Sequence, residues 1–234
     1  MFYYYYDWTY LLVVAGALIC IAASARVKSV FARYSQVQSH AGMTGREAAE
    51  QILHRNGIYD VQVIHIRGNL TDHYNPGNKT LGLSDTVYGS TSVAAIGVAA
   101  HECGHAVQHA RGYAPLRIRG ALVPVANFGS TAAWPLIIVG LFLNGETALL
   151  FINLGILLFS AAVLFQIVTL PVEFNASSRA VKVLEHSGML YPEEVGSVKK
   201  VLGAAALTYV AGAASMVLQL LRLIILTGGR RRND

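Results

Sequence analysis

The sequence predicts a mainly α-helical integral membrane protein with about four transmembrane helices and a small α+β domain. Hydrophobic residues make up 54% of the 234 residues, and charged residues make up only 13%. In soluble domains the charged share is about 25%. The charge is also unevenly placed, because Glu146 is the only charged residue between Pro124 and Pro171. Low charge and a long uncharged stretch together favour membrane helices over a soluble domain.

The expected transmembrane helices are four long apolar runs, at residues 8–23, 120–143, 147–170 and 201–226. A helix needs about 20 apolar residues to cross the hydrocarbon core of a bilayer. Only the polar sequence NGET separates the second run from the third, so these two runs predict a transmembrane hairpin. The fourth run contains Arg222, which a membrane helix tolerates near one of its ends.

The basic residues predict which side of the membrane each loop faces. Ten of the eighteen Lys and Arg residues lie between Arg26 and Arg119, and four lie between Arg179 and Lys200. Because cytoplasmic loops carry an excess of Lys and Arg, we expect both segments in the cytoplasm, in a multi-pass protein of the cell (inner or plasma) membrane. If the fourth run crosses completely, the tail GGRRRND lies outside against this rule, so the side of the tail stays open.

Local signals predict a helix and strands between the first two runs. Thr44 and Glu47 form a T-x-x-E capping box at the start of a helix, and Gly57 lies where this helix should end. The segment VQVIHIR at residues 61–67 alternates apolar and polar residues, which predicts a half-buried strand. The segment KTLGLS at residues 79–84 predicts another strand, either an ordinary paired strand or an edge strand that binds extended substrate by strand addition.

A further helix is predicted from about Val93 to His109, because the serine and threonine residues at 90–92 can cap its start. This helix contains the sequence HECGH. His101 and His105 lie on one face, so both imidazoles can bind a single metal ion. Glu102 is turned about 100° around the helix, so it can reach a water on the metal without binding the metal. These residue types in this spacing indicate a zinc peptidase with Glu102 as general base.

Such a site needs a third metal ligand. His109 shares the face, but three histidines at this spacing form a nearly straight row about 12 Å long, which cannot surround one tetrahedral metal. Glu173 directly follows the expected hairpin, where Pro171 can begin a new helix, so the hairpin should bring it back near the two histidines. The spacing alone does not decide between Glu173 and the remaining candidates, which are Glu185, Glu193, Glu194, Asp72 and His73.

Residues 72–116, from DHYNPGNKT to HARGYAPL, and LPVEFNASSRA at residues 170–180 closely resemble the YugP-like neutral zinc metallopeptidases of bacterial membranes. The chain is more distantly similar to the HtpX-type membrane proteases, in which a glutamate after a transmembrane pair is the third ligand. By motif that glutamate is Glu173. The resemblance implies one zinc ion per chain, bound by Glu173 and the two histidines, and a cytoplasmic zincin-like (gluzincin) catalytic domain.

One departure from the HtpX-type pattern concerns the residues after Glu173. Those sequences continue with Ala-Asp, whereas this chain continues with FNAS. The carboxylate that would orient a zinc-binding histidine is absent, so Asn175 and Ser177 are the candidates for that role. Arg179 is a candidate for stabilising the transition state, and weaker candidates are His73, Tyr74 and His186.

These observations divide the chain into five parts. We expect a first transmembrane helix at 1–24, a cytoplasmic part with a helix, a short sheet and the HECGH helix at 25–119, a transmembrane hairpin at 120–170, a cytoplasmic helix with the third zinc ligand at 171–200, and a fourth membrane helix with a basic tail at 201–234.

The expected function is that of a zinc endopeptidase that hydrolyses membrane or membrane-proximal polypeptides. The alternative is a zinc-binding membrane scaffold or regulator with little proteolytic activity, against which the intact Glu102 argues. A soluble secreted protease would require residues 120–170 to be a buried core. The expected partners are a polypeptide substrate and the lipid bilayer. An oligomer or a regulatory membrane partner is a further candidate, and no nucleic acid is expected.

Overall fold

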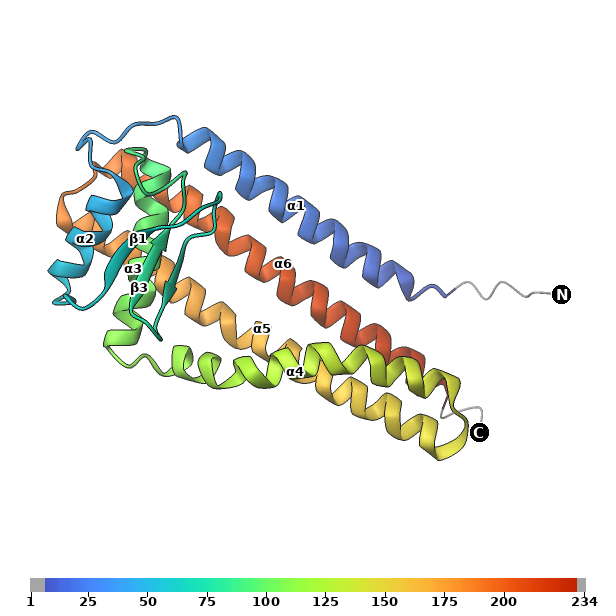
Figure 1. The fold of residues 1–234 in the computed structure, drawn as a ribbon. Helices are drawn as coiled ribbons and strands as arrows, with labels where there is room; N and C mark the ends of the chain where they lie inside the picture. The colour runs from blue at the N-terminus through green and yellow to red at the C-terminus, as the bar shows by residue number, and fades with distance from the viewer. Residues whose placement is uncertain (1–6, 231–234) are drawn as a thin grey trace. The chain divides into compact units, whose positions relative to one another are not determined.

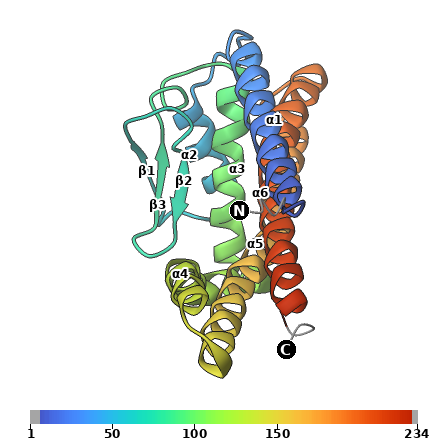
Figure 2. The ribbon, with the colours of Figure 1, turned by 90° about the vertical axis from the view of Figure 1, so that its right-hand side faces the viewer.

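The computed structural model describes residues 7–230, and within this range the chain forms six α-helices and three β-strands (Figures 1 and 2). In chain order, these are α1 (Tyr10–Tyr34), α2 (Gly45–Arg55), β1 (Gln62–His65), β2 (His73–Asn75), β3 (Thr80–Leu83), α3 (Val93–Ala110), α4 (Ala114–Phe142), α5 (Gly145–Ser187) and α6 (Pro192–Arg230).

The contacts divide the chain into two compact units. The helical unit contains the described residues up to Ala23, Ile118–Leu170 and the described residues from Tyr209 on. The mixed unit contains Ser24–Arg117 and Pro171–Thr208. These two units do not test the residue bounds that the sequence predicts for the transmembrane segments, and those bounds stay predictions.

Four helices, α1, α4, α5 and α6, are long and apolar enough to cross a membrane, which confirms the prediction of four long apolar helices. Many of their large hydrophobic side chains are exposed, among them Leu18, Phe128, Leu150 and Leu157. Exposed apolar surface of this extent is unusual in a soluble monomer and typical of a surface that contacts lipid or another protein.

Glycines allow α4 and α5 to pack closely in the helical unit. A Cβ added at Gly140 would lie 2.6 Å from Ile152 Cγ1, and one added at Gly155 would lie 2.6 Å from Ile137 Cγ1. Each glycine therefore accepts an isoleucine of the opposite helix. Small residues of this kind let membrane helices approach and gain packing energy.

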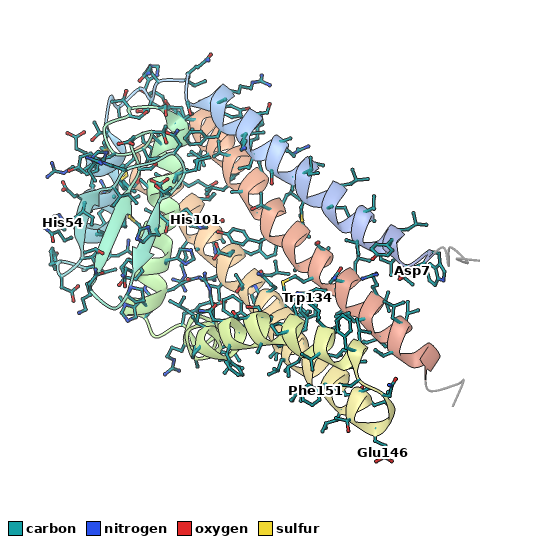
Figure 3. All side chains as sticks on the ribbon, turned by 45° about the vertical axis from the view of Figure 1, so that its right-hand side comes forward. Asp7, His54, His101, Trp134, Glu146 and Phe151 are labelled. Atoms are coloured by element: carbon teal, nitrogen blue, oxygen red, sulfur yellow. The ribbon has the colours of Figure 1, made fainter. Side chains whose placement is uncertain are left out.

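Arg222 has a partner at the N-terminal end of α1. Its Nη2 lies 3.0 Å from Asp7 Oδ2, and its Cζ lies 4.1 Å from the centre of the Tyr10 ring. Asp7 is labelled at the start of α1 in Figure 3. The C-terminal part of α6 thus lies beside the start of α1. Further along α1, the Cys20 thiol donates to the Ala211 carbonyl of α6, so the two helices are antiparallel in the helical unit, and the fourth run is helical past Arg222. Residues 231–234 of the expected basic tail lie outside the described residues.

The sheet of the mixed unit has the strand order β1-β3-β2, so β3 is its central strand (Figure 2). β1 is parallel to β3, with Val63 opposite Leu81, and β2 is antiparallel to β3, with Tyr74 opposite the same Leu81. The expectation of an edge strand at residues 79–84 is therefore wrong, and the alternative of an ordinary paired strand is right. The physical reason is burial: Leu81, Gly82 and Leu83 are all buried, as in a strand with neighbours on both sides.

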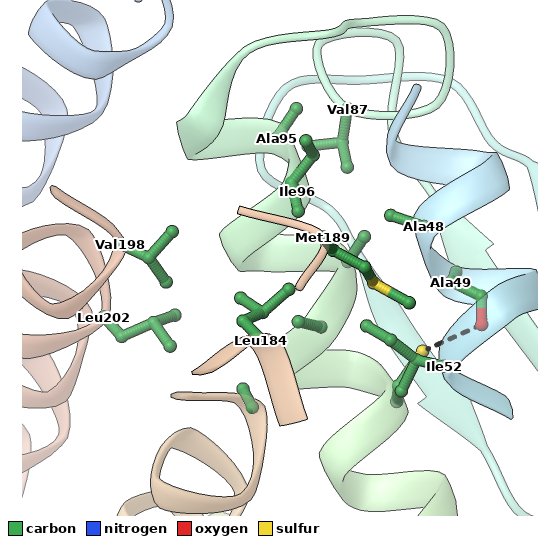
Figure 4. Close-up of a cluster of buried hydrophobic side chains, with 14 of the residues drawn as sticks. Ala48, Ala49, Ile52, Val87, Ala95, Ile96, Leu184, Met189, Val198 and Leu202 are labelled. Atoms are coloured by element: carbon green, nitrogen blue, oxygen red, sulfur yellow. Dashed lines mark hydrogen bonds between the residues drawn. The ribbon is translucent and has the colours of Figure 1, made fainter. Parts of the chain in front are cut away.

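The core of the mixed unit forms where α2 packs on α3 (Figure 4). Ala48, Ala49 and Ile52 are buried along one face of α2, and the Cys103 thiol of α3 donates to the Ala49 carbonyl at 3.5 Å. Both helix starts agree with the sequence. The capping box of Thr44 and Glu47 begins α2, and Ser92 caps α3 by accepting from the Ala95 N–H.

Candidate metal centre

His101, His105 and Glu173 lie together in the mixed unit, with their ligand atoms within 4.8 Å of one another. Glu173 Oε2 lies 3.3 Å from His101 Nε2 and 3.5 Å from His105 Nε2. In a tetrahedral site with zinc–ligand distances of about 2.0–2.1 Å, neighbouring ligand atoms lie about 3.4 Å apart. The three donors therefore fit zinc in chemistry and in spacing. All three side chains are largely buried, and His101 is labelled in Figure 3.

Helix packing brings Glu173 to the histidines. The histidines are one turn apart on α3, and Glu173 comes from α5, which continues through Pro171 without interruption. Pro171 therefore does not begin a new helix, although it removes one backbone donor. Gly104 allows the approach, because a Cβ at this position would lie 2.6 Å from the Ala176 carbonyl oxygen of α5.

Hydrogen bonds on the opposite ring nitrogens orient both histidines. His101 Nδ1 lies 3.1 Å from Ser177 Oγ, and His105 Nδ1 lies 3.0 Å from Gln108 Oε1. Gln108 Nε2 donates to the Val172 carbonyl at 2.8 Å, so its amide oxygen has to face His105. His105 Nδ1 therefore carries the proton, and the lone pair of neutral His105 is on Nε2, which faces Glu173.

Asn175 and Arg179 extend this network. Asn175 Oδ1 accepts from Gln108 Nε2 at 3.0 Å and from Arg179 Nε at 2.7 Å, and the Arg179 guanidinium lies over the Tyr113 ring at 5.8 Å. Asn175 thus contacts His105 only through Gln108, whereas Ser177 contacts His101 directly. That these two residues replace the missing carboxylate stays a prediction, as does a transition-state role for Arg179.

Glu102 lies beside the cluster without belonging to it. It is buried, and its Oε2 accepts from the backbone N–H of Tyr74, in β2, at 3.0 Å. The Tyr74 hydroxyl in turn lies 2.8 Å from His109 Nδ1. His109 therefore bonds to Tyr74 and lies outside the cluster, as expected from the spacing along the helix.

The other candidate residues have different partners. His73 precedes Tyr74 in β2, so its side chain points to the opposite face of the sheet, and it bonds to the Thr71 carbonyl. His186 lies thirteen residues beyond Glu173 in the same helix, about 20 Å along the axis. The other candidates for the third ligand also have partners elsewhere or are exposed. The Asp72 carboxylate accepts from the Ser84 N–H, and Glu185 pairs with Lys199. The Glu194 carboxylate accepts from the backbone N–H groups of His40 and Tyr191, and Glu193 is exposed. In the described part of the chain, His101, His105 and Glu173 form the group able to hold a metal.

The electrostatics of the cluster favour a cation. Burial alone would lower the pKa of His105, but the neighbouring Glu173 carboxylate, 3.5 Å from His105 Nε2, and the charge of Glu102 outweigh burial and raise this pKa above the ordinary value. Two carboxylates therefore face two imidazoles in a buried site. A divalent cation would balance their charge.

The sequence interpretation missed the role of Gln108 and the contact between the Tyr74 N–H and Glu102. Gln108 is fully buried and lies three residues after His105, a spacing at which helical side chains can meet. A polar residue on the face of the metal ligands is the signal that could have identified it. No comparable local signal exists for Tyr74, because only the pairing of β2 with β3 places its N–H at Glu102.

Comparisons with known proteins identify the family of the chain. Residues 9–228 match the model of a family described as "Putative neutral zinc metallopeptidase". The chain is 48% identical over 223 residues to the "Putative membrane protease YugP" of Bacillus subtilis (strain 168), covering 95% of this chain and 98% of the relative. No solved structure matches the chain significantly. The protein belongs to this family of neutral zinc metallopeptidases.

Proposed function

We propose that the protein is a membrane-embedded zinc endopeptidase that hydrolyses membrane or membrane-proximal polypeptides. The observation that carries the proposal is the position of Glu102, a buried carboxylate beside a three-ligand cluster of which it is not a member. A structural zinc site has four protein ligands and needs no such carboxylate, whereas a catalytic site leaves one position open.

One zinc ion per chain would be held by His101 Nε2, His105 Nε2 and a Glu173 oxygen. Bound zinc supplies Lewis acidity, which lowers the pKa of water and polarises the scissile carbonyl. Glu102, held by the Tyr74 N–H, takes the proton of the attacking water and passes it to the leaving amine. Gln108 and Ser177 keep the Nε2 atoms of the two histidines directed at the site.

β2 is the edge strand that contacts α3, the helix that carries His101 and His105. An extended substrate would therefore pair with β2. Tyr74 directs its N–H away from β3 toward Glu102. In an antiparallel ladder, the carbonyl of the same residue points to the same side. The Tyr74 carbonyl is therefore the backbone acceptor that β2 offers to a substrate strand.

The placement in the cell (inner or plasma) membrane, with the metal centre in the cytoplasm, is supported by three observations. Four apolar helices and a relative named as a membrane protease indicate a membrane protein. The mixed unit contains thirteen of the eighteen Lys and Arg residues. Cytoplasmic segments are enriched in such residues.

The Glu102→Gln variant tests the proposal. General base catalysis contributes about 10²–10⁴-fold, so cleavage of fluorescent casein should fall at least 100-fold while zinc content stays at the wild-type level. Glu185→Gln is the matched control, because Glu185 is an exposed carboxylate paired with Lys199, and it should cleave normally. Full cleavage by zinc-loaded Glu102→Gln would refute the catalytic role. A zinc-loaded wild type without any cleavage would favour the scaffold alternative.

A further inference from the structure

A polar cavity lies in the mixed unit, formed by α1 and α6. Its volume is about 550 Å³. On α1, Arg26, Val30 and Arg33 follow at intervals of four and three residues, so they share one helix face. The facing residues of α6 show the same periodicity: Lys200, Gly203, Ala204 and Leu207. The buried ring of Tyr34 completes the lining.

The charge of this cavity is positive and unbalanced. Arg26, Arg33 and Lys200 form no ion pair with any residue between positions 7 and 230. Two of them lie over the Tyr34 ring, with Arg33 Cζ at 5.7 Å and Lys200 Nζ at 5.9 Å from its centre. Lys199, by contrast, is paired with Glu185 at 2.6 Å. Three like charges around one hollow repel each other, and a bound anion would relieve this repulsion.

The same cavity also has an apolar side. Val30 and Leu207 line it, and Gly203 and Ala204 leave it open. A Cβ added at Gly203 would meet no atom within 4 Å, so the space in front of this glycine is empty of protein. A ligand that fills the cavity should therefore combine an anionic group with an apolar chain.

The position of the cavity along the helices matches the phosphate level of a bilayer. Arg26 follows the first expected span by two residues, and Lys200 directly precedes the fourth. This position of the cavity in the bilayer rests on the proposed membrane placement. Basic pockets between membrane helices at this level bind the head groups of anionic lipids, and arginine pairs well with phosphate oxygens.

We propose that this cavity binds one anionic phospholipid. Arg26, Arg33 and Lys200 hold its phosphate, and one acyl chain lies along Val30 and Leu207. The site is separate from the metal ligands, and its lining residues have no part in the proposed peptidase chemistry, so either proposal can fail without the other.

Native mass spectrometry of the full-length, zinc-loaded protein in detergent tests the proposal, with added phosphatidylglycerol or phosphatidylcholine. We expect one phosphatidylglycerol to be retained per chain and phosphatidylcholine to be lost. A membrane-surface Lys or Arg contributes about 1 kcal/mol to the binding of an anionic lipid. Arg33→Gln with Lys200→Gln should therefore weaken retention about 30-fold. The control is Lys28→Gln with Lys199→Gln, which removes the same charge from the same two helices outside the lining and should bind as wild type.

The Gly203→Leu variant distinguishes lipid binding in the cavity from lipid binding by diffuse positive charge on the surface. It keeps all three cations and fills open space, so zinc content and thermal midpoint should not fall while the lipid is lost. Equal retention by wild type and either lining variant would overturn the proposal. Displacement of the lipid by an equal concentration of inorganic phosphate would overturn the lipid assignment in favour of a free anion.

Discussion

Gly104 lies where α5 crosses α3 beside the metal ligands, so Gly104→Ala should disturb the site without touching a ligand. The new Cβ would lie 2.6 Å from the Ala176 carbonyl oxygen, where ordinary contacts begin at 3.4 Å. The obstacle is backbone and cannot rotate away, so α5 has to retreat by about 0.8 Å. Glu173 is one helical turn from Ala176 and should retreat with it.

This displacement is large for a metal ligand, because metal–ligand distances in proteins vary by only about 0.2 Å. We expect zinc affinity to fall about 10–100-fold, the range found when the support of a metal ligand is lost. Overpacking costs about 1–3 kcal/mol, whereas the alanine gains up to about 1 kcal/mol in helix propensity. The thermal midpoint should therefore change much less than the zinc affinity.

Competition with a chromophoric chelator measures the zinc affinity. Gly196→Ala is the matched control, because Gly196 is also helical and a Cβ there meets no atom within 4 Å. This variant should bind zinc as wild type and unfold at the same or a higher temperature. Wild-type zinc affinity in Gly104→Ala would refute the inference that the close approach of α3 and α5 sets the ligand geometry.

Two further predictions concern buried polar groups of the mixed unit. Gln108→Leu introduces an apolar side chain of similar length and removes the hydrogen bond to His105 Nδ1, so zinc binding should weaken about 10–100-fold in the same chelator assay. Unchanged affinity would show that Gln108 does not orient the histidine. Burial raises the pKa of the Cys103 thiol well above its ordinary value, so in a Cys20→Ser background this thiol should resist N-ethylmaleimide at pH 8 and react only after denaturation. Rapid labelling of the native protein would contradict the burial of Cys103.

Features determined by neighbouring residues could be predicted from the sequence. The capping box of Thr44 and Glu47 and the N-cap Ser92 require only a few consecutive residues, and both are present in the structure. The common face of His101 and His105 follows from helical periodicity alone. Long apolar runs were likewise sufficient to identify the four apolar helices.

Features determined by tertiary contacts could not be predicted in the same way. β3 is central because β1, which precedes it by fourteen residues, pairs with it in parallel, and nothing within KTLGLS specifies that partner. Gln108 links His105 to α5 only because Val172 and Asn175 of α5 approach its side chain. The helix through Pro171 shows the same limit, since proline often marks a boundary but does not impose one when packing supports the helix.

The most direct test of the central claim is the zinc content of purified variants, measured by mass spectrometry of the metal. We predict about one zinc per chain in wild type, His109→Ala and Glu185→Ala, and loss of zinc in Glu173→Ala, with all four proteins folded by circular dichroism. Full zinc content in Glu173→Ala together with loss in His109→Ala would contradict the assignment of His101, His105 and Glu173 as the metal site.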